Sequence, residues 1–176
     1  MRRTAALLAR GADIKMALFD VDGVLTDGRI ILGPDGGEYK CFDVRDGQGI
    51  AMLRAAGIEV GIITGRQSQV VAERMSELGI EEVHQGVRDK SAKLADILKR
   101  NELKAQQVCY VGDDLPDLSV MLSVGLPLTV RDADPRVLEV AAAVTDAGGG
   151  RGAVREVCEL ILEANGLLAD IVAAYR

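Results

Sequence analysis

A short apolar run that stops at two carboxylates constrains this chain more than any other feature. Residues Met16 to Phe19 are apolar, and Asp20, Asp22 and Gly23 follow them. A run of this length is typical of a buried strand in a parallel sheet, which places both acids at its carboxyl end, where open α/β sheets bind ligands. Two carboxylates this close repel each other unless a cation or a shared proton lies between them. The stretch therefore predicts a metal site, most simply for Mg²⁺, which prefers oxygen ligands.

Further strand-like runs alternate with helical patterns along the rest of the chain. This alternation predicts a three-layer, Rossmann-like α/β fold, with a parallel sheet and helices on both faces. Two β-prone runs around the turn cluster at 33–37 predict a β-hairpin flap, about 28–43, instead of a cap domain. We expect a single domain over 1–176, with a C-terminal helix and tail at about 153–176. Strands are expected at 16–19, 58–63, 82–85, 107–111, 126–130 and 143–145, and helices within 1–12 and at 49–56, 67–78, 91–100, 135–142 and 155–165.

Composition excludes several classes of protein. The net charge is −6 and aromatic residues make up 3% with no Trp, which argues against a nucleic-acid partner. No apolar run reaches the length of a membrane span. The cysteines Cys41, Cys109 and Cys158 are widely spaced and match no zinc pattern, and we expect the last two to be buried. A protein of the reducing cytoplasm is the expectation.

Chemically interesting residues follow four of the expected strands. Asp20 and Asp22 follow the first, and Thr64, Lys90 and Asp113 each follow a later one. Alone, Thr64 would be a helix cap, Lys90 a solvated lysine and Asp113 an acid at a helix start. Because the carboxyl ends of parallel strands share one edge of a sheet, the set is expected to converge, and this favours a common site.

The carboxylates of such a site suit phosphoryl transfer. Asp20 is expected to attack phosphorus and form an aspartyl-phosphate. Asp22 would protonate the leaving oxygen and later deprotonate the attacking water. Asp113 would hold Mg²⁺ together with Asp20 and the main-chain carbonyl of Asp22, so that the metal screens the nucleophile from the anionic phosphate.

The remaining strand ends suit the phosphate itself. Thr64 and the backbone N–H of Gly65 would hold phosphoryl oxygens, and Lys90 would supply a compact positive charge. The sequence thus predicts a metal-dependent phosphatase that uses an aspartate as its nucleophile.

Several stretches resemble a known family. Four motifs match those of the haloacid dehalogenase-like phosphatases: Asp20–Val24, Thr64–Arg66, Lys90 and Gly112–Asp117. Three further stretches and the hairpin resemble the 3-deoxy-D-manno-octulosonate 8-phosphate phosphatase family: Phe42–Ile50, His84–Gly86 and Gly149–Cys158. The resemblance covers about 14–166. It implies Mg²⁺-dependent hydrolysis of that sugar-acid phosphate to the free sugar acid and phosphate, in lipopolysaccharide precursor synthesis.

The resemblance also implies a homotetramer in which neighbouring subunits complete each active site. A small flap alone would leave the phosphoenzyme open to water, so a neighbour could supply the missing wall. The substrate carboxylate needs a cation other than Lys90; Arg66 and Arg74 would share a helix face if that helix began at Arg66, and Arg45 is a third candidate. The expected substrate-binding residues are Asp22, Asp43, Val44, Arg45, Asp46, Gly47, Gly65, Arg66, Arg74 and Lys90.

Two other functions stay open at this point. Phosphatases of N-acylneuraminate-type 9-phosphates are similar but tend to carry an acidic residue where Arg66 stands, which favours the octulosonate ester. A non-catalytic regulatory subunit of the same fold is the other alternative. Ala51 stands where the family often has a basic residue, and Arg74 is as readily a surface charge as a ligand. The loop 148–152 is either a linker or, through Arg151, an anion contact.

Overall fold

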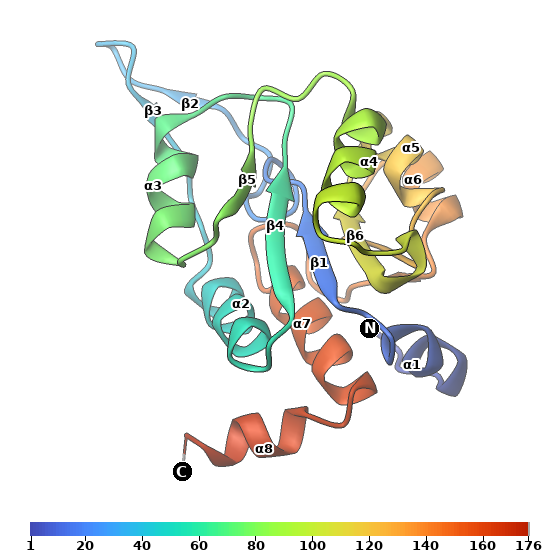
Figure 1. The fold of residues 1–176 in the computed structure, drawn as a ribbon. Coiled ribbons are helices and arrows are strands. Elements are labelled where there is room, and N and C mark those ends of the chain that lie inside the picture. Colours follow the sequence, from blue (N-terminus) through green and yellow to red (C-terminus); the bar gives the residue numbers. More distant parts are fainter. Residues whose placement is uncertain (176) are drawn as a thin grey trace.

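A six-stranded parallel sheet forms the centre of the computed structural model, which describes residues 1–175 (Figure 1). The strand order is β5-β4-β1-β6-β7-β8, and each neighbouring pair is parallel. The predicted parallel α/β fold is confirmed. The strands are β1 (Met16–Phe19), β4 (Glu59–Ile63), β5 (Glu82–His84), β6 (Val108–Gly112), β7 (Leu126–Thr129) and β8 (Ala143–Val144).

Helices cover both faces of this sheet. On one side α7 packs against α2 and α1, and on the other α4 packs against α5 (Figure 1). The α-helices are α1 (Ala5–Gly11), α2 (Val44–Ala55), α3 (Gln69–Glu77), α4 (Lys90–Arg100), α5 (Leu118–Met121), α6 (Pro135–Val140), α7 (Ala153–Ala164) and α8 (Leu168–Ala173), with 3₁₀ turns η1 (Ala105–Gln107) and η2 (Leu115–Asp117). No helix among residues 1–175 is both long enough and apolar enough to cross a membrane.

The strand order places a switch point between β1 and β6. The chain runs from β1 to β4 and β5 on one side, and then crosses to β6 on the other. Connections therefore leave β1 and β6 in opposite directions, which opens a crevice at their carboxyl ends. Asp20 follows β1 and Asp113 follows β6, so both acids lie at this crevice.

The predicted hairpin is present and stands away from the main sheet (Figure 1). Its strands, β2 (Ile31–Leu32) and β3 (Glu38–Tyr39), pair antiparallel, with Ile31 opposite Tyr39. Both of these side chains are exposed. The structure thus carries a small flap in the position where a cap domain would otherwise be inserted.

Helix α2 begins at Val44, five residues before the predicted start at Gly49. The mixed charge of 43–47 and Gly47 at its end suggested a loop there, because glycine is a poor helix former. Gly49 lies within the predicted helix, and the structure gives a reason for it: a Cβ at Gly49 would lie 3.1 Å from the Cα of Arg155 on α7. Asp43 caps the helix by accepting a hydrogen bond from the Arg45 amide at 2.8 Å.

Asp46 lies inside this extra turn and faces α7. Its residue is 1% exposed, and its carboxylate accepts hydrogen bonds from the amides of Arg155 at 2.7 Å and Gly152 at 3.3 Å. A carboxylate at this position satisfies free N–H groups at the start of α7 and is favoured by the helix dipole. The sequence placed Asp46 among substrate-binding residues, whereas the structure turns it toward the α2–α7 interface.

We therefore expect Asp46→Asn to weaken the fold rather than substrate binding. The amide offers only one acceptor oxygen and no charge to the start of α7, so the free energy of unfolding should fall by about 1–3 kcal/mol. Urea denaturation measures this change, with the exposed Asp96→Asn on α4 as the control. Unchanged stability together with a raised KM would instead support a substrate contact.

Candidate active site

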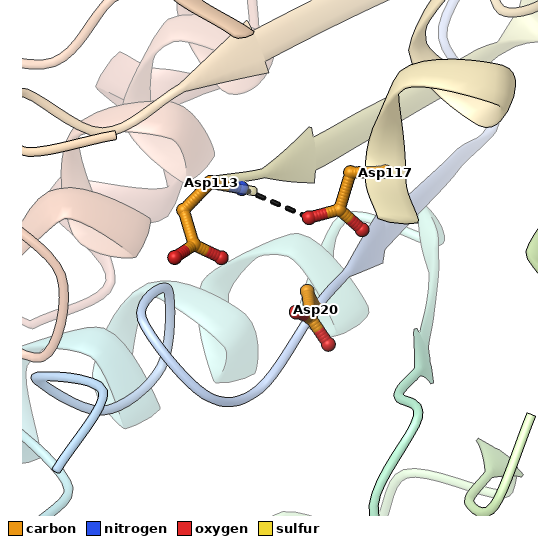
Figure 2. A group of neighbouring side chains, drawn as sticks. All are labelled: Asp20, Asp113 and Asp117. Atoms are coloured by element: carbon orange, nitrogen blue, oxygen red, sulfur yellow. Dashed lines mark hydrogen bonds between the residues drawn. The ribbon is translucent and has the colours of Figure 1, made fainter. Parts of the chain in front are cut away.

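Three aspartates meet at the crevice between β1 and β6 (Figure 2). Asp20, Asp113 and Asp117 each offer one carboxylate oxygen, and these oxygens all lie within 4.8 Å of one another. Asp20 is 8% exposed and Asp117 is fully buried. Such proximity of carboxylates requires compensating positive charge.

Asp117 is held by four hydrogen-bond donors. Its Oδ1 accepts from Lys90 Nζ at 2.7 Å and from the Tyr110 hydroxyl at 2.6 Å. Its Oδ2 accepts from the amide of Asp113 at 3.0 Å, the bond drawn in Figure 2, and from that of Asp114 at 3.2 Å. With both oxygens occupied, Asp117 braces the loop after β6 and the ammonium of Lys90.

The other two aspartates keep oxygens that accept no hydrogen bond within residues 1–175, although Lys90 Nζ lies 3.1 Å from Asp20 Oδ1. Asp20 Oδ1 and Asp113 Oδ1 are buried, and neither receives a hydrogen bond from the residues that the structure describes. Orphaned carboxylate oxygens that face a common space fit a hard divalent cation. Gly23 lets the loop after β1 approach Asp113, because a Cβ there would overlap that carboxylate and its φ is +95°. Asp20, Asp113 and the carbonyl oxygen of Asp22 are thus the candidates to hold Mg²⁺.

The electrostatics of the cluster show the same need for a cation. Burial raises the pKa of Asp113 to about 8, and the neighbouring charges of Asp20 and Asp117 add to this effect. Burial also raises the pKa of Asp20 to about 6, although the ammonium of Lys90 opposes the shift. Without a further positive charge, the surroundings therefore disfavour the ionised form of both carboxyls relative to an exposed aspartate.

Lys90 lies in the first turn of α4 and is 4% exposed. Its Nζ lies 2.7 Å from Asp117 Oδ1 and 3.1 Å from Asp20 Oδ1. Burial lowers the pKa of this lysine, but the two carboxylates outweigh it and hold the pKa above its usual value. Lys90 is therefore a fixed positive charge beside the predicted nucleophile.

A cleft of about 570 Å³ opens above these residues. It unites the residues expected at the strand ends, including Thr64, which is 2% exposed. Predicted site residues that line it are Asp20, Asp22, Thr64, Gly65, Arg66, Lys90 and Asp113, joined by Gly28, Val87, Arg88, Asp114, Pro116 and Asp117.

The two candidate arginines do not share a helix face. Helix α3 begins at Gln69, so Arg66 lies in the loop before it. The two arginines would have shared a helix face only if the helix had begun at Arg66. Arg66 reaches the cleft. Arg74 instead lies with its guanidinium carbon 5.9 Å from the ring centre of Phe42 and pairs with Glu77 at 3.1 Å.

The segment 43–47 also lies outside the chain's own cleft. Val44 is 79% exposed, and the Arg45 side chain pairs with Asp43 at 2.7 Å. One N–H of Arg45 is donated to the carbonyl of Arg151 at 3.0 Å. Any contact of this segment with substrate therefore stays a prediction that requires a neighbouring subunit.

Sequence reasoning missed two charges that the flap brings to the site. Lys40 donates a hydrogen bond to the carboxylate of Asp22, and Glu38 accepts one from Arg66 at 2.9 Å. Glu38 and Lys40 lie two residues apart on a β-prone run. This spacing could have predicted that both side chains face the same side, because alternate residues of a strand do so. Tyr110, inside β6, was missed as well, since nothing in an apolar run marks a hydroxyl that will bond to Asp117.

The glycine-rich loop 148–152 packs against the backbone of the loop after β1. The amide of Gly150 donates to the carbonyl of Val24 at 2.9 Å, and a Cβ at Gly149 would overlap the carbonyl oxygen of Gly23. The loop is therefore a packing element of the site, and Arg151 within it is exposed.

Comparisons with known proteins show which family of enzymes this chain resembles. A family model described as haloacid dehalogenase-like hydrolase matches residues 47–128. The 3-deoxy-D-manno-octulosonate 8-phosphate phosphatase KdsC of Escherichia coli (strain K12) is 46% identical over 167 residues, which are 95% of this chain and 89% of that protein.

Solved structures are similar over almost the whole chain. A probable YrbI family phosphatase from Pseudomonas syringae pv. phaseolica has a TM-score of 0.96 at 49% identity, and covers 98% of both chains. The 3-deoxy-D-manno-octulosonate 8-phosphate phosphatase from Moraxella catarrhalis, solved with magnesium, phosphate and KDO, has a TM-score of 0.95 at 39% identity and covers 97% of this chain and 98% of that one. The chain therefore belongs to the 3-deoxy-D-manno-octulosonate 8-phosphate phosphatase family of haloacid dehalogenase-like hydrolases.

Proposed function

We propose that this enzyme is an Mg²⁺-dependent phosphatase that hydrolyses 3-deoxy-D-manno-octulosonate 8-phosphate to the free sugar acid and phosphate. The observation that carries the proposal is the pair of buried oxygens of Asp20 and Asp113 that accept no hydrogen bond from the described part of the chain, with the ammonium of Lys90 3.1 Å from the first. Relatives that are 46% identical carry this activity in their names. The reaction belongs to lipopolysaccharide precursor synthesis.

The chemistry assigns unequal roles to the two acids after β1. Asp20 attacks phosphorus, the ester bond breaks, and an aspartyl-phosphate forms. Asp22 gives its proton to the leaving alkoxide oxygen and then takes a proton from the water that attacks the aspartyl-phosphate. Bound Mg²⁺ supplies positive charge that screens the carboxylate nucleophile from the phosphoryl oxygens.

The other residues of the cleft hold the phosphoryl group and the sugar acid. Thr64, the amide of Gly65 and the ammonium of Lys90 stabilise the charge that develops on the phosphoryl oxygens. Arg66 lies at the cleft with 45% of its side chain exposed, where its guanidinium can receive the substrate carboxylate. A cation at this position favours the octulosonate ester over the neuraminate-type alternative.

Assays on purified enzyme with Mg²⁺ test the substrate. We expect kcat/KM on 3-deoxy-D-manno-octulosonate 8-phosphate to exceed that on an N-acylneuraminate 9-phosphate by about tenfold or more. Both esters carry a carboxylate, but a site that fits the first loses about 1–3 kcal/mol on a longer, N-acylated analogue. Asp20→Asn should reduce turnover to background with an unchanged circular dichroism spectrum, whereas Asp35→Asn in the flap turn should behave as wild type.

The opposite preference would favour the neuraminate-type alternative. A folded enzyme that is inert on both esters and on an aryl phosphate would favour the non-catalytic regulatory alternative. Normal turnover in Asp20→Asn would contradict the assigned nucleophile.

We further propose that the enzyme is a cytoplasmic homotetramer in which neighbouring subunits complete each cleft. Exposed apolar side chains on the flap, Ile31 and Tyr39, support a contact between subunits, as does the exposed Val44 beside the predicted substrate segment. The free cysteines Cys41, Cys109 and Cys158 fit a reducing compartment, and the last two are buried as expected.

Analytical ultracentrifugation tests the assembly. The wild type should sediment as a tetramer, and Tyr39→Asp should dissociate it and lower kcat/KM, because a charge would enter an apolar contact. Leu122→Asp, which changes an exposed leucine just after α5, is the matched control and should leave the tetramer intact. A monomeric and fully active wild type would contradict this part of the proposal.

A further inference from the structure

Four charged side chains form a closed ring at the mouth of the cleft. Arg66 Nη2 lies 2.9 Å from Glu38 Oε1, and the same Glu38 oxygen lies 3.5 Å from Lys40 Nζ. Lys40 Nζ also contacts Asp22 Oδ1, and Asp22 Oδ2 lies 3.7 Å from Arg66 Nε. We call these four residues the charge ring. Two of its members come from the flap and two from loops that follow β1 and β4.

The flap presents its two charges because β3 is extended. Side chains alternate along a strand, so Glu38 and Lys40 point to one side and Tyr39 to the other. The observed exposures agree: the Lys40 side chain is 0% exposed and that of Glu38 is 17% exposed, whereas Tyr39 is 59% exposed. The side of β3 that faces the cleft is therefore charged.

With Asp22 ionised, the charges alternate in sign around the ring and sum to zero. A fully covered lysine requires anionic partners, and Lys40 has Asp22 and Glu38. Without Lys40, these two carboxylates would share only the guanidinium of Arg66, and their repulsion would favour a flap that lies further from the cleft. Ion pairs on an open surface contribute little, but a network with a buried member is screened less.

The geometry at Arg66 leaves room for a substrate. Glu38 accepts from one terminal nitrogen of Arg66, while the guanidinium has five N–H groups and its side chain is 45% exposed. The remaining N–H groups can meet a carboxylate in two parallel bonds. Glu38 thus fixes the direction of the guanidinium without occupying all of its donors.

We propose that Glu38 and Lys40 are positioning residues, and that the charge ring holds the flap over the cleft and aims Arg66 at the carboxylate of the substrate. The inference deepens the proposed function and rests on it for the identity of the substrate. It makes the flap a determinant of specificity for phosphate esters that also carry a carboxylate.

Steady-state kinetics on two esters test the role of Glu38. In Glu38→Gln, KM for 3-deoxy-D-manno-octulosonate 8-phosphate should rise by about tenfold, because Arg66 loses its charged partner. The kcat/KM on ribose 5-phosphate, which has no carboxylate, should fall by a clearly smaller factor, since this ester loses only the flap and not a contact with Arg66. Glu38→Asp should recover part of the loss. An equal effect on both esters would overturn the proposal.

A double-mutant cycle tests whether Glu38 acts through Arg66. In an Arg66→Met background, Glu38→Gln should produce no further rise in KM for the octulosonate ester, because the residue that it positions is absent. Additive effects of the two substitutions would show that Glu38 acts independently of Arg66, which would sink the positioning role.

Hydrogen–deuterium exchange of the purified enzyme, whatever its oligomeric state, tests the charge ring without any substrate. Lys40→Met should speed exchange of the amides at 29–42, whereas Arg29→Gln, which changes an exposed charge on the same flap, should not. Unchanged exchange in Lys40→Met would overturn the proposal. Failure of the wild type to hydrolyse the octulosonate ester would contradict the proposed function. The exchange rates of the flap amides would still decide whether the charge ring holds the flap.

Discussion

The concentration of negative charge between β1 and β6 is the constraint on which the rest of the structure depends. Asp20, Asp113 and Asp117 converge around the ammonium of Lys90. Like charges 4 Å apart near a protein surface repel each other by about 4 kcal/mol. The fold offsets this repulsion in part with the four donors on Asp117, which include the hydroxyl of Tyr110. Mg²⁺ supplies the remaining positive charge in this family of phosphoric monoester hydrolases.

The backbone around the cluster is shaped to keep these charges in place. Gly23 allows the loop after β1 to touch Asp113, and Gly149 allows the glycine-rich loop to support that loop from behind. Asp46 anchors the start of α7, which follows the glycine-rich loop. The proposed catalytic groups therefore rest on tightly packed elements, while the residues that we propose to select the substrate lie on the flap and on loops at the rim.

Much of the site could be predicted from sequence because its signals are local. The apolar run before Asp20 and the polar residues after later strands needed only the topology of a parallel sheet to bring them together, and the cleft contains Thr64, Lys90 and Asp113 as expected. Their individual roles in catalysis stay predictions.

The rest depended on packing between distant segments, which no local pattern records. The sequence predicted a loop at 43–47, but α2 begins at Val44, and Gly49 lets this helix approach α7. Asp46 looked like a ligand of the substrate, but its partners are amides more than a hundred positions away. Arg74 could not be separated from Arg66 without the true start of α3. The contact of Lys40 with Asp22 could not be predicted because it forms only when the flap packs against the loop after β1.

The most direct test of this account is to trap the phosphorylated enzyme. A single turnover of the Mg²⁺-loaded enzyme would be quenched in acid, reduced with borohydride and digested for mass spectrometry. An acyl phosphate on Asp20 is reduced to an alcohol, so we expect homoserine at position 20 only in samples that received substrate. Homoserine at another aspartate, or steady turnover with no modified peptide at any quench time, would contradict the central claim that Asp20 is the nucleophile.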